Sequence, residues 1–168
     1  MEPTERISIE ADKMDFEFTV GGWELLDEIE PLWTELNRHH IESSTHFAAT
    51  YEHMTFQERR KVIDRRPPGT KLRVELVMLK DGKVYVAYCV TSLAPDGAGE
   101  IESIYVDNGF RCLGLGSKLM RDAIKWLDEQ GARKKRLWVA SGNEQAFHFY
   151  ERHGFQIRRT ELEQTKSP

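Results

Sequence analysis

Arg111-Cys112-Leu113-Gly114-Leu115-Gly116 is the stretch that decides the fold of this chain. It follows an apolar, strand-like run at residues 101–106 and opens into an amphipathic pattern from Ser117 to Gln130. We therefore expect a strand that turns through glycines into a helix. The start of such a helix attracts anions, because its first backbone N–H groups lack partners and its dipole adds about half a positive charge.

The spacing of the glycines excludes two familiar phosphate-binding loops. A P-loop requires G-x-x-x-x-G-K-[ST], which does not occur, and the dinucleotide fingerprint requires a third glycine where this chain has Leu119. What remains is R-x-x-G-x-G between a strand and a helix. Taken alone, this pattern has two interpretations, a phosphate-binding loop or a tight turn without a ligand.

A second motif follows further along the chain. Residues 136–140 suggest a strand, Ser141-Gly142-Asn143 a turn and residues 144–153 a helix. Gly154 is placed to end that helix, and Phe155 begins another extended run. The motif is Asn143-x-x-Ala146-x-x-x-Tyr150-x-x-x-Gly154-Phe155.

The two motifs, in this order and at this separation, resemble those of the GNAT superfamily of acetyl-CoA-dependent N-acetyltransferases. The resemblance covers residues 84–158. Two positions depart from the family pattern, since Asn108 stands where a proline is frequent and Cys112 where a glycine is common. Both residues keep their backbone N–H, but the Cys112 side chain must fit where the family usually has a hydrogen atom.

The other elements agree with this resemblance. We expect a loose tail over residues 1–14 and a single domain over residues 15–165. The expected strands and helices of its first part are Phe16–Val20, a helical region 23–42 split at Pro31, a helix from Thr55 to Asp64, and strands 72–79 and 84–93 joined at Asp81-Gly82. The predicted fold class is mixed α/β, and the resemblance implies the GNAT fold, a central, mostly antiparallel, splayed sheet flanked by helices.

Composition narrows the class of protein further. The formal net charge of −4 argues against general nucleic-acid binding. The first residues contain no apolar segment of signal-peptide length, and no apolar run is long enough to span a membrane. Two cysteines, Cys89 and Cys112, make no disulfide framework. We therefore expect a cytoplasmic protein.

The resemblance implies a set of cofactor-binding residues. Backbone groups of Ile104, Tyr105 and Val106 would hold the pantetheine arm of acetyl-CoA, and Asn143 would bond that arm or hold the splayed strand. The residues expected at the pyrophosphate are Arg111, Cys112, Leu113, Gly114, Leu115, Gly116 and Ser117. Two alternatives stay open, a solvated Arg111 and a simple helix cap at Asn143.

Tyr150 is the candidate general acid. A free phenol has a pKa of about 10 and a thiol one of about 8.5, so a neutral tyrosine is available at pH 7 to donate to a departing thiolate. The resemblance gives the tyrosine of the second motif this role and a place beside the cofactor. The alternative is a core aromatic next to Phe147 and Phe149.

Glu102 is the candidate base. Strict alternation along the strand places Glu102, Ile104 and Val106 on one side and Ile101, Ser103 and Tyr105 on the other. A carboxylate among apolar neighbours would have a raised pKa and become a useful base. The alternative is a partly exposed strand residue paired with a lysine or an arginine.

Weaker features leave further alternatives open. The run Arg133-Lys134-Lys135-Arg136 suits solvent, a 3′-phosphate or a nucleic acid. The cluster of His39, His40 and His46 matches no metal template, and we predict no metal. Cys112 as a nucleophile would require an acyl-enzyme. The acidic residues between Glu24 and Glu42 suit a solvated helix face or the lining of a site for a cationic amine.

The sequence thus predicts an N-acetyltransferase that moves an acetyl group from acetyl-CoA to a primary amine by direct attack. The acceptor would be a small, polyamine-like amine or a peptide amine. The expected partners are acetyl-CoA and this acceptor, without membrane or nucleic acid, and a homodimer is an option. The rival prediction is a non-catalytic module of the same fold that binds acetyl-CoA or another protein.

Overall fold

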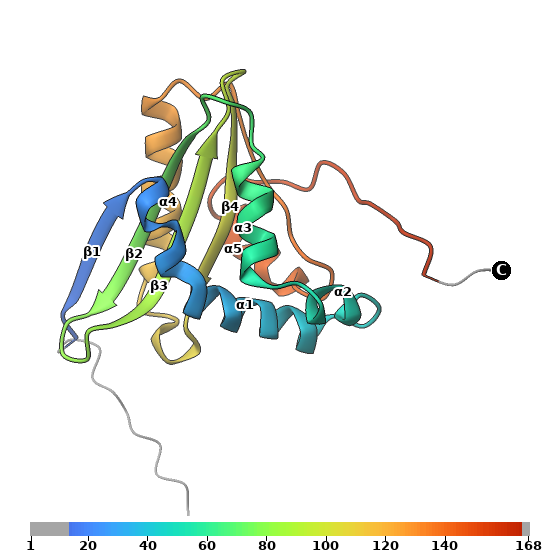
Figure 1. Ribbon diagram of the computed structural model, residues 1–168, viewed down its shortest axis with the longest axis horizontal. Coiled ribbons are helices and arrows are strands. Elements are labelled where there is room, and N and C mark those ends of the chain that lie inside the picture. The colour runs from blue at the N-terminus through green and yellow to red at the C-terminus, as the bar shows by residue number, and fades with distance from the viewer. Residues whose placement is uncertain (1–13, 166–168) are drawn as a thin grey trace, which may run out of the picture.

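Five strands form one sheet in the computed structural model, which describes residues 14–165 (Figure 1). The strands, in their order across the sheet, are β1 (Phe16–Gly21), β2 (Lys71–Leu79), β3 (Val84–Leu93), β4 (Ala98–Val106) and β5 (Lys134–Leu137). The first four are antiparallel, and β5 runs parallel to β4. This arrangement confirms the predicted fold class. The expected tail lies, except for Met14, outside the described residues.

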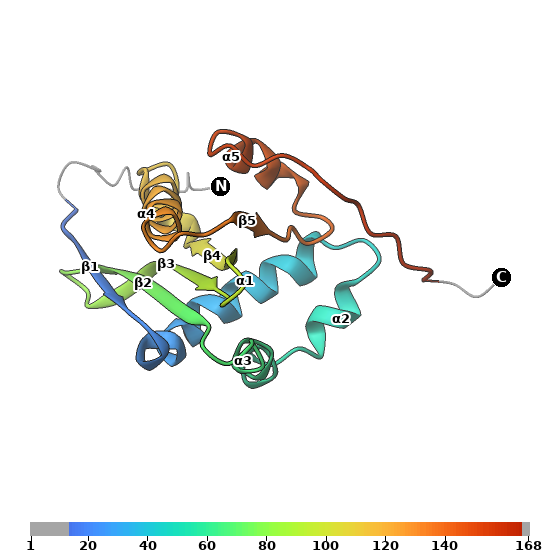
Figure 2. The same ribbon diagram turned by 90° about the horizontal axis from the view of Figure 1, so that it is seen from above.

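Helices cover both faces of the sheet (Figure 2). The helical elements are η2 (Trp23–Ile29), α1 (Glu30–Ser43), α2 (Ala48–Glu52), α3 (Phe56–Asp64), η3 (Asn108–Phe110), α4 (Leu115–Glu129), η4 (Glu144–Ala146) and α5 (Phe147–Glu151). One face carries η2, α1 and α3, with Leu26, Trp33 and Ile63 in its core, and the other carries α4, with Leu119 and Leu127. No described helix is long and apolar enough to cross a membrane.

The N-terminal helices begin and end where the sequence predicts. The 3-10 helix η2 ends at Ile29, and Pro31 lies in the first turn of α1, where its missing N–H removes no helical bond. Helix α3 begins with a capping box, in which the Thr55 hydroxyl accepts from the Glu58 N–H at 3.2 Å and the Glu58 carboxylate accepts from the Thr55 N–H at 2.8 Å. The short helix α2 was not predicted.

Strand β5 lies two residues earlier than its predicted start. It covers Lys134–Leu137, so most of the basic run belongs to the strand instead of preceding it. Charged side chains are compatible with this strand because two of them have carboxylate partners. Arg136 bonds Glu100 at 2.8 Å, and Lys135 pairs with Asp128. Pairing with β4 ends at Ile101 and Leu137, so the rest of β4 has no paired strand on this side within residues 14–165.

The end of the domain differs from the prediction in two ways. The helix expected over residues 144–153 is divided between η4 and α5, and the strand expected from Phe155 is absent from the described residues. Gly154 does end the helix, with φ +84° and with bonds from its N–H to Glu151 at 2.9 Å and from the Phe155 N–H to Tyr150 at 3.1 Å. Residues 156–165 lead away from the body of the protein and have no neighbouring strand with which to pair (Figure 1). The expected strand therefore does not form.

Candidate functional site

The predicted anion site lies at the start of α4. The first intrahelical bond runs from the Lys118 N–H to the Gly114 carbonyl at 3.0 Å, and no side chain caps the helix. The N–H groups of Leu115, Gly116 and Ser117 therefore have no acceptor within the helix. Together with the helix dipole, these donors make a site for a phosphate group.

Two residues of the loop adopt left-handed backbone conformations. Gly114 has φ +81°, which suits a glycine, and a Cβ built at this position would meet no atom within 4 Å. Cys112 has φ +64°, where a side chain costs energy. The departure from the family pattern at Cys112 is therefore accommodated by backbone strain, with the thiol exposed.

Arg111 closes the turn that leads into this loop. Its Nε donates to the Val106 carbonyl at 3.1 Å, and its guanidinium carbon lies 5.9 Å from the centre of the Tyr105 ring. The side chain therefore joins the loop that precedes α4 to the end of β4. Arg111 is exposed, so the solvated alternative stays open, and a contact with phosphate stays a prediction.

A bulge in β4 overturns the predicted alternation. The register with β3 shifts so that Ser103 faces Val90 and Ile101 faces Thr91, leaving Glu102 as the extra residue. Ile101 and Ile104 both pack on the α4 side, while Tyr105 packs on the α3 side. Glu102 does not share a face with Ile104 and Val106, as predicted, because one extra residue reverses the faces of all that follow.

The environment of Glu102 is polar and charged, so the predicted apolar surroundings were wrong. Its side chain is fully buried and accepts from the Ser92 hydroxyl at 2.6 Å and from Arg66 at 2.7 Å. Arg59 donates to its carboxylate at 3.3 Å and to its backbone carbonyl at 2.9 Å. Arg66 also bonds Glu100 at 2.8 Å. The alternative given for Glu102, pairing with a basic residue, is closer to the structure.

The second half of β4 offers backbone groups to a ligand. Beyond Ile101 the strand lacks a partner on the β5 side within the described residues, although Ile104, Tyr105 and Val106 still pair with β3. The strand then leads through η3 to the loop before α4. An extended ligand could therefore pair with β4 while its phosphates lie at the helix start.

Tyr150 lies on α5, on the α4 side of the sheet. It packs in the same cluster as Ile104 and Val106, and its ring centre is 5.3 Å from that of Phe149. Burial raises the pKa of Tyr150 to about 12, so its hydroxyl stays protonated at neutral pH. Tyr150 and Glu102 thus lie on opposite sides of β4. The structure is compatible both with an acid and with a core aromatic.

Asn143 contacts α1 instead of capping its own helix. Its Oδ1 lies 3.4 Å from Nε2 of His39, whose Nδ1 lies 3.5 Å from the Ser43 hydroxyl. Gly142 permits this approach, since a Cβ there would lie 2.2 Å from the Ser43 carbonyl oxygen. The capping alternative is not supported, and Asn143 instead joins the turn after β5 to α1.

Some residues near the candidate site were missed by sequence reasoning. The sequence suggests His39 only as a possible metal ligand, and Arg59 and Arg66 belong to no motif. The arginines lie 43 and 36 positions from Glu102 in the chain, so only the fold brings them there. No group of three or more His, Cys, Asp or Glu residues suited to a metal ion occurs between residues 14 and 165.

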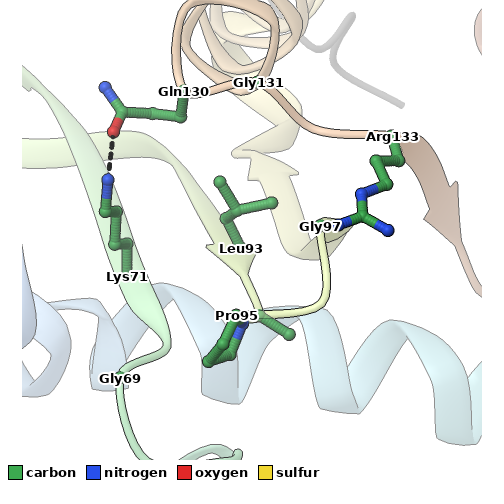
Figure 3. Close-up of a pocket in the computed structure, with 9 residues that line it drawn as sticks. Gly69, Lys71, Leu93, Pro95, Gly97, Gln130, Gly131 and Arg133 are labelled. Carbon is green, nitrogen blue, oxygen red and sulfur yellow. Dashed lines mark hydrogen bonds between the residues drawn. The ribbon is translucent and has the colours of Figure 1, made fainter.

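A cavity of about 200 Å³ lies away from these residues (Figure 3). It is found where β2 begins, β3 ends and α4 ends, and Lys71 donates to Gln130 across it at 2.7 Å. Helix α4 is 15 residues long, so the cavity lies about 20 Å from the helix start. None of the predicted site residues lines it.

The family of the chain follows from comparison with known proteins. The model of the acetyltransferase (GNAT) family matches residues 24–155, and the chain belongs to this family. An uncharacterized N-acetyltransferase of Methanocaldococcus jannaschii is 36% identical over 67 residues, 40% of this chain and 30% of that protein. The match therefore spans less than a third of that relative.

Solved structures show the same fold. A Pyrococcus furiosus protein regarded as an acetyl transferase has a TM-score of 0.64 at 25% identity, with 88% of this chain and 99% of that chain covered. Glucosamine-6-phosphate N-acetyltransferase from Arabidopsis thaliana has a TM-score of 0.55 at 18% identity, covering 88% and 97%. An aminoglycoside N-acetyltransferase in complex with CoA has a TM-score of 0.60 at 14% identity, covering 91% and 95%.

Proposed function

We propose that this protein transfers the acetyl group of acetyl-CoA to a primary amine by direct attack in a ternary complex. The observation that carries the proposal is the uncapped start of α4 beside the unpaired half of β4. A long ligand with phosphates at one end and an extended amide-containing arm fits this combination. Family membership supports acetyl-CoA as that ligand.

The cofactor would lie along β4 with its pyrophosphate at the loop. Backbone groups of Ile104, Tyr105 and Val106 would pair with the pantetheine arm, because this half of the strand has no partner on the β5 side. The donors proposed for the pyrophosphate are the N–H groups of Cys112, Leu113, Gly114, Leu115, Gly116 and Ser117, with Arg111 adding charge. Asn143, in the turn after β5, would contact the pantetheine arm from the β5 side.

Tyr150 would donate to the sulfur as the thiolate leaves. With a pKa of about 12 its hydroxyl is protonated over the whole neutral range, so it is available as a donor at every working pH. The thiolate is the weaker base, with a pKa of about 8.5 for its thiol, so Tyr150 stabilises the developing charge mainly by a hydrogen bond. Its raised pKa predicts no loss of this donor below pH 9.

Glu102 would take the amine proton, on the opposite side of β4 from Tyr150. Its place in β4, two residues before the groups proposed to hold the pantetheine arm, supports this role, whereas the full burial of its side chain opposes it. Its partners oppose the role, because two arginines and Ser92 already stabilise the charged carboxylate. The same partners favour the rival function, a module that binds acetyl-CoA without turning it over.

The acetyl acceptor is proposed only at the level of a chemical class, a primary amine. Glucosamine-6-phosphate and an aminoglycoside are the acceptors named for two structural neighbours. The acidic residues of η2 and α1 give little support to a cationic acceptor, because Glu24, Asp27, Glu28, Glu30 and Glu42 are exposed. We further propose a cytoplasmic homodimer; the unpaired Cys89 and Cys112 support this location.

Release of free thiol from acetyl-CoA tests the proposal across polyamines, amino sugars, aminoglycosides, amino acids and short peptides. Turnover with one class establishes the enzyme and identifies its acceptor. Binding of acetyl-CoA without any turnover favours the non-catalytic module, and the absence of binding refutes the assigned cofactor site.

Once the acceptor is identified, Tyr150→Phe should lower kcat by about 10²- to 10³-fold, the usual loss for removing one hydrogen-bond donor to developing charge, with little change in acetyl-CoA affinity. The matched control is Tyr85→Phe, which removes a phenol from β3 on the α1 side of the sheet. Unchanged turnover of Tyr150→Phe would leave Tyr150 as a core aromatic.

A further inference from the structure

Strands β4 and β5 stop pairing at one point of the sheet, the fork. The last pair of their ladder joins Ile101 to Leu137, and β4 continues beyond it to Val106. In the proposed complex the pyrophosphate lies at the loop after β4, and the pantetheine arm runs back along residues 104–106 toward the fork. The acetyl group, at the far end of this arm, would therefore lie near the fork. The side chains gathered there decide which acceptor can reach it.

Three arginines from separate elements meet at the fork, on the α3 side of the sheet. Arg59 lies on α3, Arg66 in the loop after it and Arg136 on β5. Their carboxylate partners are Glu100 and Glu102, whose side chains are buried. These five residues form the arginine cluster. Because three cations face two anions, the cluster has one positive charge in excess.

Every oxygen of the two carboxylates already accepts a hydrogen bond. The Oε1 and Oε2 atoms of Glu100 accept from Arg66 and Arg136, each at 2.8 Å. The Oε1 of Glu102 accepts from Ser92 at 2.6 Å, and its Oε2 accepts from Arg66 at 2.7 Å. A cationic group brought to the cluster would therefore compete for oxygens that are already bonded, and the excess positive charge would repel it.

The arginines, in contrast, have N–H groups without an acceptor. Arg136 donates through Nε alone, so its two terminal nitrogens have no partner among residues 14–165, and its side chain is 45% exposed. Arg59 uses one terminal nitrogen for both of its bonds and is partly exposed. Guanidinium groups bind carboxylates and phosphates well, because paired N–H donors match the spacing of two acidic oxygens.

An exposed tryptophan follows the cluster along β5. Lys135 pairs with Asp128 of α4, and Leu137 packs in the core on the α4 side, whereas Arg136 lies on the α3 side. Trp138 continues the alternation of exposed and half-buried residues, with 68% of its surface exposed. An aromatic ring beside a cation can cover the apolar part of a ligand whose charged part pairs with that cation.

We propose that the acetyl acceptor is a primary amine that also carries an acidic group, a carboxylate or a phosphate, and that the arginine cluster binds this group. The inference rests on the proposed function, because the cluster meets the acceptor only if the acetyl group is delivered to the fork. Pairing of the acid with Arg136 or Arg59 cancels the excess charge and holds the amine beside the thioester. A polyamine, which adds only positive charge, is disfavoured at the same place.

Binding of matched amines to the full-length protein saturated with CoA tests the proposal without turnover, since CoA has no acetyl group to transfer. The pairs for isothermal titration calorimetry are ornithine with putrescine and glucosamine 6-phosphate with glucosamine. The first pair differs by a carboxylate and the second by a phosphate, so the two acids are separated. We expect the acid-bearing member of at least one pair to bind about tenfold or more tightly than its partner, the usual effect of one charge-assisted hydrogen bond.

Substitution of Arg136 shows whether the cluster causes this preference. Arg136→Gln should weaken binding of the preferred acid-bearing amine about tenfold and leave its acid-free partner and CoA unchanged. Arg136→Glu makes the excess charge negative, so it should make putrescine bind more tightly than ornithine. Arg121→Gln, at an exposed arginine of α4 on the other face of the sheet, is the matched control. A folding defect would weaken CoA binding as well and would change the circular dichroism spectrum.

The outcomes separate this inference from the proposed function. Equal binding within both pairs, tighter binding of the acid-free amines, no binding of any of the four, or a preference that survives both Arg136→Gln and Arg59→Gln would overturn the inference. Release of thiol from acetyl-CoA is measured separately with the same amines. A preference for acidic amines without any turnover refutes acetyl transfer and keeps the acid-binding cluster, whereas turnover of acid-free amines without the preference refutes only the cluster's role.

Discussion

At the scale of single residues, backbone conformation and burial decide the properties of the candidate site. Gly114 and Cys112 both have positive φ, but only the glycine is suited to it. His40 is largely buried beside Tyr51, and its Nδ1 has no hydrogen-bond partner among the described residues. The Cys112 conformation could not be read from the sequence, although the usual glycine of the family at this position was a hint of it.

Replacing Cys112 by glycine should stabilise the protein. The left-handed conformation costs a side chain about 1 kcal/mol or more, partly offset by the greater freedom of glycine in the unfolded chain. We expect the free energy of unfolding to rise by roughly 0.5–1 kcal/mol, measured in urea. Gly114→Ala is the opposite experiment, because it adds a side chain at a left-handed position. It should lower the free energy of unfolding by about 1–2 kcal/mol, and this cost comes from the backbone alone, since a Cβ there meets no atom within 4 Å. A less stable Cys112→Gly variant would contradict this account.

His40 should make stability depend on pH. Burial, followed by the neighbouring His39, lowers the pKa of His40 to about 4. Below pH 6.5 the imidazole of His40 is therefore protonated in the unfolded chain but still neutral in the folded protein. The free energy of unfolding falls for this reason as the pH drops from about 6.5 to about 4. The loss attributable to His40 should reach roughly 2 kcal/mol, discounted for its partial exposure. Replacing His40 by Phe should flatten this region of the curve, whereas His53→Gln, at an exposed position, should leave it unchanged.

At the scale of secondary-structure elements, the β4 bulge determines what surrounds Glu102. The sequence predicted the strand and the residue but not the bulge, because bulges arise from pairing with a neighbouring strand. The added residue turns Glu102 toward α3 and the loop after it, where Arg59 and Arg66 lie. The first turn of α4, in contrast, was predictable, since local glycines and hydrophobic periodicity specify it.

Glu102→Gln separates a base from a structural anchor. Removing the buried charge leaves Arg59 without a charged partner and leaves Arg66 with Glu100 alone, so we expect a loss of stability of about 2–3 kcal/mol in either case. If Glu102 is the base, kcat should also fall and the acidic limb of the pH–rate profile should move. An unchanged profile with lowered stability would assign Glu102 to anchoring α3 on β4. Glu129→Gln, at an exposed position on α4, is the control for loss of a carboxylate.

At the scale of the whole molecule, the cofactor would connect elements that the chain leaves apart. Acetyl-CoA would contact β4, the α4 N-terminus and the region of Asn143, which α1 holds through His39. A ligand that binds only the folded protein stabilises it by about 2.7 kcal/mol at a hundredfold excess over Kd. Much of this gain should come from bridging β4 and the turn after β5.

Acetyl-CoA should therefore raise the melting temperature by about 5–10 °C at that excess, measured by differential scanning calorimetry. Tyr150→Phe should keep most of the shift, because its hydroxyl acts on the departing thiolate. Gly114→Ala should lose much of it at equal ligand concentration, since the loop would no longer present its N–H groups in the same geometry. If Gly114→Ala kept the full rise in melting temperature, the phosphates would have to bind at another part of the protein.

The sequence by itself determined the order of the elements apart from α2 and the strand after Phe155, the loop from Arg111 to Gly116, the second motif around Tyr150 and the family, because these depend on neighbours close along the chain. Only the tertiary structure decided the surroundings of Glu102, the contact of Asn143 with His39 and the absence of a strand after Phe155. These depend on how strands pair and helices pack, and residues dozens of positions apart meet there. One extra residue in β4 was enough to reverse a prediction based on alternation, since side chains change face with every residue of a strand.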